Sequence, residues 1–507
     1  MDKSEVKVIV SLTTHDIRLT NGTAEKVIKN ILDGTFKDIH VVLTLFKDDI
    51  DKIPASLKTL IDENTIELII ADENLRPHLK YFYAMQKYRD LPVITIDDDI
   101  LYPDNFVEEL YKNWLLHKDC IIGRRCYRII SVNGQLARYF YWMRSGIVKT
   151  LEPTQAVFAT GVGGILYPPN CLELSEKDIP EIKETLIDDD FYLKAKEIKK
   201  GIKIFSIISD ENKLYKQNLD DPVTQSIALG LINCAQGESD NNIAKYYFEF
   251  LEASKDRFID FIVSVTSFGE RMNNMLPKIL ESLYAQTNQN FKVSITLTQE
   301  DFDTITNQFL KDRIQTGEYE VIIADQNLKP HLKYFYVMQM YPDMPIVTID
   351  DDTLLPNIAF DELYSTYCRC GKQYVYGRQV FEYRGLGYSI LGSRTLYADE
   401  PPNHKFMIEG FSGVLYPPHV FGDFYKDENE LKKIKELIHD DDIYLKGLEI
   451  RRNVLVKNCP WMTVNRHQAI DTNTDLEQYE LHKRTNTDEV RTKNFEKIKE
   501  EIEKVFK

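Results

Sequence analysis

Residues 71–99 read ADENLRPHLKYFYAMQKYRDLPVITIDDD, and residues 324–352 read ADQNLKPHLKYFYVMQMYPDMPIVTIDDD. The two stretches are identical at 21 of 29 positions, and His331 follows His78 by 253 residues. This period is far longer than the roughly 20–50 residues of solenoid and propeller repeats. The sequence therefore predicts two tandem domains that share one fold.

Other segments repeat at nearly the same spacing. Residues 9–18 (IVSLTTHDIR) match 262–271, residues 161–169 (GVGGILYPP) match 410–418, and residues 187–194 (IDDDFYLK) match 438–446. The small changes in spacing indicate short loop insertions within one shared fold. The junction falls within 238–257, where helical and polar residues precede the first strand of the second copy. We therefore expect an N-terminal domain over 1–240, a linker over 241–257 and a C-terminal domain over 258–507.

Composition limits the class of protein. The 507 residues carry a net charge of −17 with 43% hydrophobic residues, as in ordinary globular proteins. A pI near 5.2 argues against nucleic acid as a partner, because phosphate binding needs a basic surface. Seven cysteines are too few for a disulfide scaffold, and no apolar run approaches the roughly 20 residues of a membrane span. We expect a cytoplasmic protein without an integral membrane segment. Peripheral contact with the inner face of the cell membrane, and self-association through a helix over 492–507, stay open.

Each copy alternates strands with helices. In the first copy, residues 6–12 form a β-branched run typical of a buried strand. Further strands are expected at 40–45, 66–71 and 92–96, and helices at 23–33, 54–62 and 79–88. This alternation predicts an α/β fold with a doubly wound sheet, followed after about residue 120 by an antiparallel portion and a terminal helix. In such sheets, ligands bind beyond the carboxyl ends of the strands.

Three consecutive aspartates follow the fourth strand of each copy. Asp97–Asp99 come after VITI, and Asp350–Asp352 come after IVTI. Because side chains alternate along a strand, we expect the first and third carboxylates to share a face. Hard oxygen ligands in this arrangement suit Mg²⁺ or Mn²⁺ that bridges a diphosphate. A solvated acidic turn is the alternative, and its recurrence after two apolar strands makes the binding role the better interpretation.

A second aspartate triplet precedes an amphipathic helix in each copy. Asp188–Asp190 precede FYLKAKEIKKG, and Asp440–Asp442 precede IYLKGLEIRRN. Helix capping alone favours Asp at such positions. A carboxylate within reach of an acceptor hydroxyl would instead act as a general base. Both roles are compatible, since one Asp can cap the helix while another faces the ligand.

Glycines and basic residues accompany the acidic segments. Gly161–Gly164 and Gly410–Gly413 permit close approach of the backbone to a ligand, although this signal is weak alone. Basic side chains at the same edge could meet a diphosphate, with ordinary surface charge as the alternative; these are Arg18, Lys80, Arg271 and Lys333. We expect His78 and His331 to be hydrogen-bonded structural residues. His467, after the last expected strand of the second copy, is a candidate metal ligand.

Together these motifs resemble those of GT-A fold, nucleotide-sugar-dependent glycosyltransferases, closest to bacterial enzymes of surface-polysaccharide synthesis. The resemblance covers about residues 6–210 and 259–465. It implies two tandem GT-A domains, each with a Rossmann-like, doubly wound mixed sheet. It also implies inverting transfer from a nucleotide sugar, with a UDP-sugar favoured, to a glycan or lipid-linked glycan acceptor, and dependence on Mn²⁺ or Mg²⁺.

The resemblance also implies residue roles. Asp190 and Asp442 match the catalytic base. The metal ligands would be Asp99, Asp352 and His467. The donor-binding residues would be Arg18, Asp72, Lys80, Asp97, Asp98, Gly163, Gly164, Arg271, Asp325, Lys333, Asp350, Asp351 and Gly413.

The two copies depart from each other, and other functions remain possible. The first copy has no equivalent of His467, and Phe-Ser replaces Val-Gly in the second glycine segment. The chain could therefore hold two active copies or one active copy beside a degraded one.

A sugar-1-phosphate nucleotidyltransferase shares the sheet and the metal, but its Gly- and Arg-rich N-terminal loop is missing. A tandem carbohydrate-binding or scaffold protein with inactive sites is the non-enzymatic alternative.

Overall fold

Strand β1 (Val8–Thr13) is buried at every residue except Thr13 in the computed structural model. It pairs in parallel with β2 (Ile39–Phe46) on one side and with β4 (Val93–Thr95) on the other. The structure describes residues 6–219, 238–382, 394–396, 398–460, 468–469 and 488–506. The chain divides into two units, Met1–Phe258 and Ile259–Lys507. Each is described by itself.

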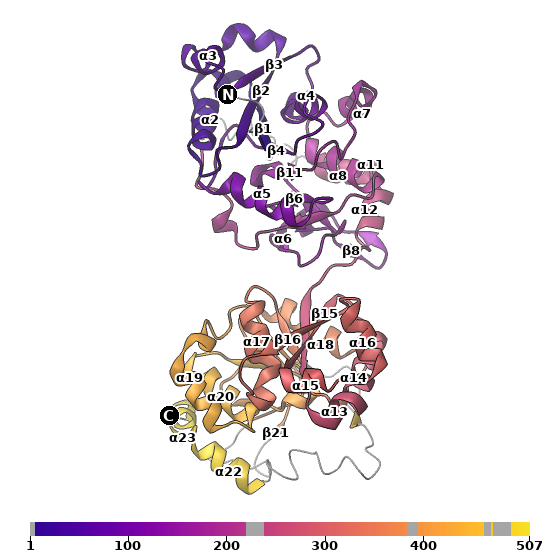
Figure 1. Cartoon of the computed structure of the whole chain (residues 1–507), viewed down its shortest axis with the longest axis vertical. Helices are drawn as coiled ribbons and strands as arrows, with labels where there is room; N and C mark the ends of the chain where they lie inside the picture. The colour runs from indigo at the N-terminus through magenta and orange to yellow at the C-terminus, as the bar shows by residue number, and fades with distance from the viewer. Residues whose placement is uncertain are drawn as a thin grey trace. The chain divides into compact units, whose positions relative to one another are not determined.

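A seven-stranded mixed sheet forms the centre of the first unit (Figure 1). Its order is β12-β6-β11-β4-β1-β2-β3. Strand β11 runs antiparallel to both of its neighbours, and the other pairings are parallel. The strands not yet given are β3 (Glu67–Ala71), β6 (Ile121–Gly123), β11 (Ile165–Tyr167) and β12 (Ile204–Ser206).

Helices cover both faces of this sheet. Val8, Val10 and Leu12 of β1 pack with helices α2 and α5, whereas Ile9 packs on the other face with α4 and α8. Apolar residues of α2 recur at positions 24, 27, 28 and 31, the spacing of an amphipathic helix. The helices of this unit are α2 (Thr23–Asp33), α3 (Ala55–Asp62), α4 (Phe82–Lys87), α5 (Phe106–Leu116) and α8 (Asp189–Lys199).

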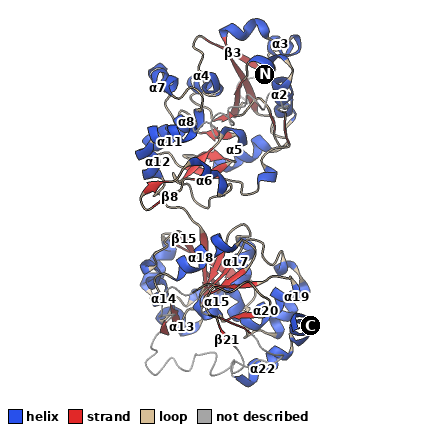
Figure 2. Cartoon of the chain, turned by 180° about the vertical axis from the view of Figure 1, so that it is seen from behind, coloured by secondary structure: helices blue, strands red, loops and turns tan. Residues whose placement is uncertain are grey.

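The second unit repeats this strand order. Its sheet reads β16-β15-β14-β17-β23-β19-β24, the same order written from the other edge. Figure 2 shows strands inside each unit with helices around them. The strands are β14 (Phe261–Thr266), β15 (Phe291–Thr298), β16 (Tyr319–Ala324), β17 (Ile346–Thr348), β19 (Val375–Gly377), β23 (Val414–Tyr416) and β24 (Val456–Asn458). The main helices are α14 (Leu276–Ser282), α16 (Gln308–Gln315), α17 (Leu332–Met340), α18 (Ala359–Cys370) and α20 (Asp441–Arg451). Two doubly wound mixed α/β sheets confirm the expected fold class.

The segment interpreted from sequence as a linker is folded. Helices α11 (Glu238–Lys245) and α12 (Tyr247–Ala253) pack on α8 of the first unit, and Phe250 is fully buried there. Aromatic contacts of Phe250 with Trp142, Phe158 and Phe191 hold α12 in place. Residues 241–253 therefore complete the first unit instead of forming a free connection. Helices α22 (Asp488–Glu496) and α23 (Lys499–Phe506) pack on α20 in the second unit.

Candidate functional site

The strand order reverses beside β1 in the first sheet and beside β14 in the second. From β1 the chain winds through β2 to β3 on one side, whereas β4 lies on the other side. Such a switch point opens a crevice at the carboxyl ends of the two strands, where α/β proteins bind ligands. Thr13 ends β1, and Asp97–Asp99 follow β4, so the first aspartate triplet lies at this crevice. In the second unit, β14 and β17 place Asp350–Asp352 in the same way.

The three aspartates after β4 meet two different cations. The Lys80 ammonium lies 3.2 Å from Asp97. Arg18 binds the other two carboxylates, at 2.9 Å to Asp98 and 2.8 Å to Asp99. The expectation that the first and third side chains share a face was wrong. Strand β4 ends at Thr95 and the chain then turns, so the alternation of a strand no longer applies.

The second unit repeats the arrangement. Lys333 lies 2.7 Å from Asp350, and Arg271 lies 2.5 Å from Asp351 and 2.6 Å from Asp352. Burial raises the pKa of the Asp351 carboxyl to about 6, against the opposing effect of Arg271. The Asp352 side chain is 34% exposed, compared with 12% for Asp99, so the third carboxylate is more open to a ligand in the second unit.

A buried lysine joins the two aspartate triplets. Besides Asp97, Lys80 binds Asp189 at 2.9 Å. Burial lowers the pKa of Lys80, but Asp189 and Asp97 outweigh it and raise the pKa well above its usual value. Lys333 bridges Asp350 and Asp441 in the same way, at 2.8 Å to Asp441. Each lysine is therefore a fixed positive charge at the carboxyl edge of the sheet.

A buried histidine near each lysine fixes the segment that carries the second triplet. His78 contacts the Tyr81 hydroxyl through Nδ1 at 2.6 Å and donates through Nε2 to the Thr185 carbonyl at 3.0 Å. In the second unit, His331 donates to the Leu437 carbonyl at 3.0 Å. Burial lowers the pKa of His331 to about 4, so the ring stays neutral. Both histidines are hydrogen-bonded structural residues, as expected.

The last aspartate of the second triplet is the candidate base. The Gly161 N–H donates to the Asp190 carboxylate over 3.1 Å, and the Gly410 N–H donates to Asp442 over the same distance. Burial and the neighbouring Asp189 raise the pKa of Asp190 well above its usual value. Burial and Asp441 likewise raise the pKa of Asp442 to about 8. A carboxyl with a pKa near neutrality is suited to exchange a proton during catalysis.

Helix capping explains only part of this triplet. The Asp440 side chain accepts from the Ile443 N–H at the start of α20. Asp188 occupies the same position before α8 and makes no such cap. The third residue of each triplet, Asp190 or Asp442, lies inside the first turn and faces the glycine segment. In the second unit, helix capping and contact with the glycine segment therefore fall on different residues of one triplet.

The first glycine of each glycine segment lies against the acidic centre. A Cβ on Gly161 would lie 2.5 Å from the Lys80 ammonium, 3.3 Å from Asp97 and 3.5 Å from Asp190. A Cβ on Gly410 would lie 2.9 Å from Asp442. Neither glycine is among the donor-binding residues that the sequence suggested. The signal was present, because the first and fourth glycines occur in both copies whereas Gly163 becomes Ser412.

The glycines singled out from the sequence have packing reasons. Gly163 lies against the Arg125 backbone, 2.6 Å from its nitrogen to an added Cβ. Gly164 has a φ of +79° and packs on the Phe106 ring, and Gly413 has a φ of +94° next to Leu363. The positions of Gly164 and Gly413 therefore favour glycine because of their positive φ, and that of Gly163 because of its close approach to Arg125.

Three other candidates lie apart from this centre. Asp72 follows β3 and Asp325 follows β16, and both are exposed at the edge of their sheets. Asp325 accepts a hydrogen bond from the Tyr336 hydroxyl. No contact joins either residue to the aspartates of the centre in the described parts of the chain. His467 lies outside the described residues.

An arginine distinguishes the second unit. Arg491 of α22 donates to Asp442 over 3.0 Å and lies 3.6 Å from Asp440. The matched position in α11 is Ser239, an uncharged residue near Asp188. Sequence reasoning missed Arg491, because it lies about 50 residues from Asp442 and has no basic counterpart in the first copy.

The carboxylates at the crevice decide how a divalent cation could be held there. Among the described residues, no three His, Cys, Asp or Glu side chains cluster as a metal site. Mg²⁺ is commonly held by one or two carboxylates together with substrate phosphates. Asp99 and Asp352 each offer such a carboxylate at the crevice. The residues therefore fit a cation whose remaining ligands come from a diphosphate.

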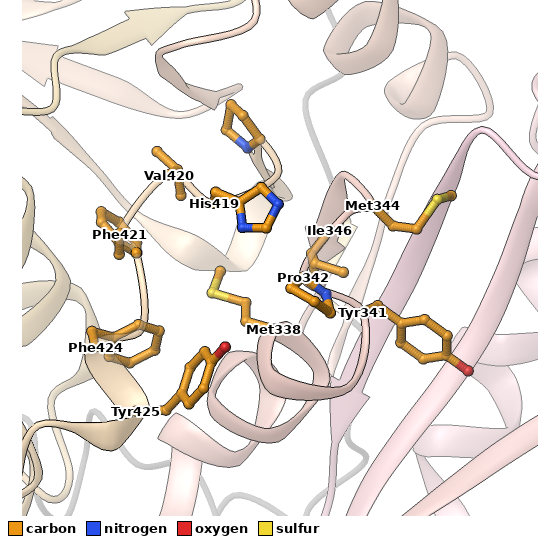
Figure 3. Close-up of a pocket in the computed structure, with 12 residues that line it drawn as sticks. Met338, Tyr341, Pro342, Met344, Ile346, His419, Val420, Phe421, Phe424 and Tyr425 are labelled. Carbon is orange, nitrogen blue, oxygen red and sulfur yellow. The ribbon is translucent and has the colours of Figure 1, made fainter. Parts of the chain in front are cut away.

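A mostly apolar pocket of the second unit lies at the amino-terminal end of strand β17, away from the acidic centre. Figure 3 shows Met338, Met344, Ile346 and Phe421 lining it, with His419 at its side. Ile346 begins β17, whereas Asp350 follows the far end of that strand. The lining is mostly apolar and none of the candidate site residues contributes to it. A similar pocket in the first unit surrounds Met85 and Leu172.

Comparison with known proteins finds solved structures of low similarity. No protein-family model matches the sequence, and no curated protein matches it. Solved structures with some similarity include S. aureus TarS, at a TM-score of 0.28 and 12% identity over 40% of this chain and 35% of that chain. S. aureus TarS 1–349 in complex with UDP gives 0.27 and 12%, over 39% of this chain and 57% of that one. This chain thus spans between a third and three fifths of those proteins.

No helix in the described ranges is long and apolar enough to cross a membrane.

Proposed function

We propose that this chain is a glycosyltransferase with a nucleotide-sugar site in each of its two units, built on two GT-A domains. One observation carries the proposal. In each unit, a carboxyl with a raised pKa lies beside a buried lysine and an aspartate triplet at the switch point of the sheet. These are the parts that a transfer from a nucleoside diphosphate sugar requires: an acid–base group and fixed charge around a diphosphate.

The base in this proposal is Asp190 in the first unit and Asp442 in the second. The ionised carboxylate takes the proton of the acceptor hydroxyl as its oxygen attacks the anomeric carbon. The bond from that carbon to the diphosphate oxygen breaks, and the nucleoside diphosphate leaves with the electron pair. A single base on the face opposite the leaving group gives inversion at the anomeric carbon. The Gly161 and Gly410 N–H groups hold the carboxylates in position.

The charges around the leaving group come from both triplets and their cations. Lys80 and Lys333 are held in place by two carboxylates each, so they need no rearrangement to stabilise developing negative charge. Arg18 and Arg271 hold the second and third aspartates of the first triplet. Asp99 and Asp352 would hold Mn²⁺ or Mg²⁺, which when bound neutralises charge on the diphosphate.

The remaining parts of the proposal concern partners. We favour a UDP-sugar as donor and a growing bacterial surface glycan, free or lipid-linked, as acceptor. Such an acceptor would be extended on the cytoplasmic side of the membrane. His467 and the exposed Asp72 and Asp325 remain predictions from sequence for metal and donor binding.

Replacement of the two bases tests the proposal. Asp190→Asn and Asp442→Asn keep the size and hydrogen-bonding capacity of the side chain but cannot take a proton. We expect each single variant to lose the transfer of one unit, and the double variant to lose all transfer while it still binds UDP. Release of UDP from a panel of UDP-sugars with acceptor glycans measures turnover. Turnover retained by the double variant would remove the assignment of the base.

A further inference from the structure

Three matched positions around the base differ in charge between the two units. Arg125, Thr160 and Ser239 of the first unit correspond to Gln379, Glu409 and Arg491 of the second. The backbone establishes the first two matches, because the Thr160 N–H donates to the Arg125 carbonyl at 2.9 Å and the Glu409 N–H donates to the Gln379 carbonyl at 3.0 Å. Arg491 follows Ser239 by 252 residues, the same spacing that separates Asp440 from Asp188, and each lies near that first aspartate of the second triplet.

In the first unit, the positive charge among the three positions belongs to Arg125, which follows strand β6. Arg125 donates to the Thr160 hydroxyl at 3.2 Å. Thr160 precedes Gly161, whose N–H binds the Asp190 carboxylate. The guanidinium also stacks over Tyr127, 5.1 Å from the ring centroid. Within the described ranges, no carboxylate forms an ion pair with Arg125, so its charge is available to a ligand beside the base.

The second unit has no positive charge at the position of Arg125, and an acid, Glu409, replaces Thr160. Gln379 stands where Arg125 stands, and its side chain hydrogen-bonds the Glu409 carboxylate. The positive charge of Arg491 instead faces Asp442 at 3.0 Å and Asp440 at 3.6 Å. It also lies near Glu409, where it opposes the effect of burial, which raises the pKa of that carboxyl. The three positions sum to one positive charge in the first unit and to zero in the second. An anionic group would meet Glu409 here, whereas neutral hydroxyls could donate to it.

We propose that the first unit binds a sugar that carries an anionic group, recognised by Arg125, whereas the second unit binds an uncharged sugar. This inference rests on the proposed function and specifies its substrate class. A guanidinium pairs with a planar carboxylate or a phosphate through two parallel hydrogen bonds, which glutamine cannot reproduce. The anionic group belongs either to the transferred sugar or to the terminal sugar of the acceptor.

Titration with two donors tests the first source. The full chain carries Asp352→Ala to remove donor binding by the second unit, and is titrated with UDP-glucose and UDP-glucuronic acid. We expect the uronate donor to bind about tenfold tighter, the effect of one charge-assisted pair. Arg125→Gln should remove this preference and leave the affinity for UDP unchanged. Arg89→Gln, which alters a surface arginine bound to the Gln86 carbonyl, should keep the preference.

Equal binding of the two donors would direct the test to the acceptor. Methyl β-glucuronide and methyl β-glucoside are then compared as acceptors. A preference for the glucuronide that Arg125→Gln abolishes assigns the anion to the acceptor.

The reverse substitution, which places the residues of the first unit in the second, tests for a gain of function. With the first unit silenced by Asp99→Ala, Gln379→Arg together with Glu409→Thr should introduce the preference into the second unit.

The outcomes separate the two proposals. UDP binding without preference in either arm would overturn the anionic-sugar assignment and leave the glycosyltransferase proposal intact. A preference that survives Arg125→Gln would also overturn the role of Arg125. Failure of UDP, and of GDP and CMP in its place, to bind would overturn both proposals.

Discussion

Arg491 donates a hydrogen bond to the Asp442 carboxylate over 3.0 Å, although the two residues lie on different helices, α22 and α20. The matched carboxylate of the first unit, Asp190, has Ser239 instead of an arginine near its triplet. The two units therefore share one arrangement of acids but control the charge of the base differently. Their activities should respond differently to pH and to mutation.

Removal of Arg491 should shift the pH dependence of the second unit. The pKa of Asp442 is about 8 with Arg491 lowering it, so Arg491→Met should raise the pKa further. The ionised base then forms only at higher pH, and turnover at neutral pH should fall several-fold. The rising limb of the rate–pH profile, measured with Asp190→Asn to silence the first unit, should move to higher pH. Arg452→Met, at the far end of α20, serves as the control; an unmoved limb would contradict the role of Arg491.

Asp190→Asn should stabilise the first unit while it abolishes transfer. The folded pKa of Asp190 is raised, so the folded state holds its proton more tightly and loses stability as pH rises from the unfolded value through the folded one. An uncharged amide avoids this cost. We expect the free energy of unfolding to rise at pH 8 and to change less at pH 4, with transfer reduced at least about 100-fold.

Denaturant unfolding at the two pH values measures this effect. Asp62→Asn, which alters an exposed acid at the end of α3, is the matched control and should change stability by less than about 0.5 kcal/mol. Equal stability of Asp190→Asn and the unaltered chain at pH 8 would mean that the buried carboxyl carries no such cost.

Gly161→Ala should disrupt the first site without unfolding it. The added Cβ would lie 2.5 Å from the Lys80 ammonium, at the far end of a flexible side chain, so the lysine can move away. That movement displaces the ammonium from its position between Asp97 and Asp189 but leaves its charge beside both carboxylates. We expect UDP affinity and turnover of the first unit to fall about tenfold or more, with a small change in melting temperature. Val162→Ala in the same turn should have little effect on UDP affinity, and equal loss in both variants would point to a general disturbance of the turn.

Lys80→Met should destabilise the first unit strongly. The substitution leaves Asp97 and Asp189 without their shared cation, and removal of one partner from a buried ion pair costs about 3–5 kcal/mol. The cost should shrink at low pH, where the carboxylates take up protons. Lys177→Met, at an exposed position, is the control for loss of charge. A melting temperature close to that of the unaltered chain at neutral pH would show that Lys80 does not hold the two triplets together.

Sequence patterns predicted the parallel part of the fold well. The expected strand at 6–12 and helix at 23–33 correspond to β1 (Val8–Thr13) and α2 (Thr23–Asp33), because buried parallel strands and amphipathic helices leave strong periodic signals. The helices at 238–253 were missed as part of the first unit. The aromatic run at 246–250 (YYFEF) indicates a helix that buries a face, but only its packing on α8 shows that it belongs to the first unit.

The site was predictable where its residues follow strands. Asp97 after β4 and Lys80 in the turn after β3 converge, because the topology brings these strand ends together, whereas Asp190 reaches them from the start of α8. Side-chain pairing was not predictable, since the division of Asp97–Asp99 between Lys80 and Arg18 depends on a turn after Thr95. Arg491 reaches the site from a helix at the end of the chain, and no local pattern links it to Asp442.

The most direct test of two working donor sites is calorimetric titration with UDP in the presence of Mn²⁺, on the unaltered chain and on Asp99→Ala and Asp352→Ala separately. We predict two binding sites in the unaltered chain, one in each variant, and weaker binding throughout when EDTA replaces Mn²⁺. A single site that only one variant loses would contradict the claim that both units bind a donor. Absence of binding by UDP, and by GDP and CMP in its place, would contradict the glycosyltransferase proposal itself.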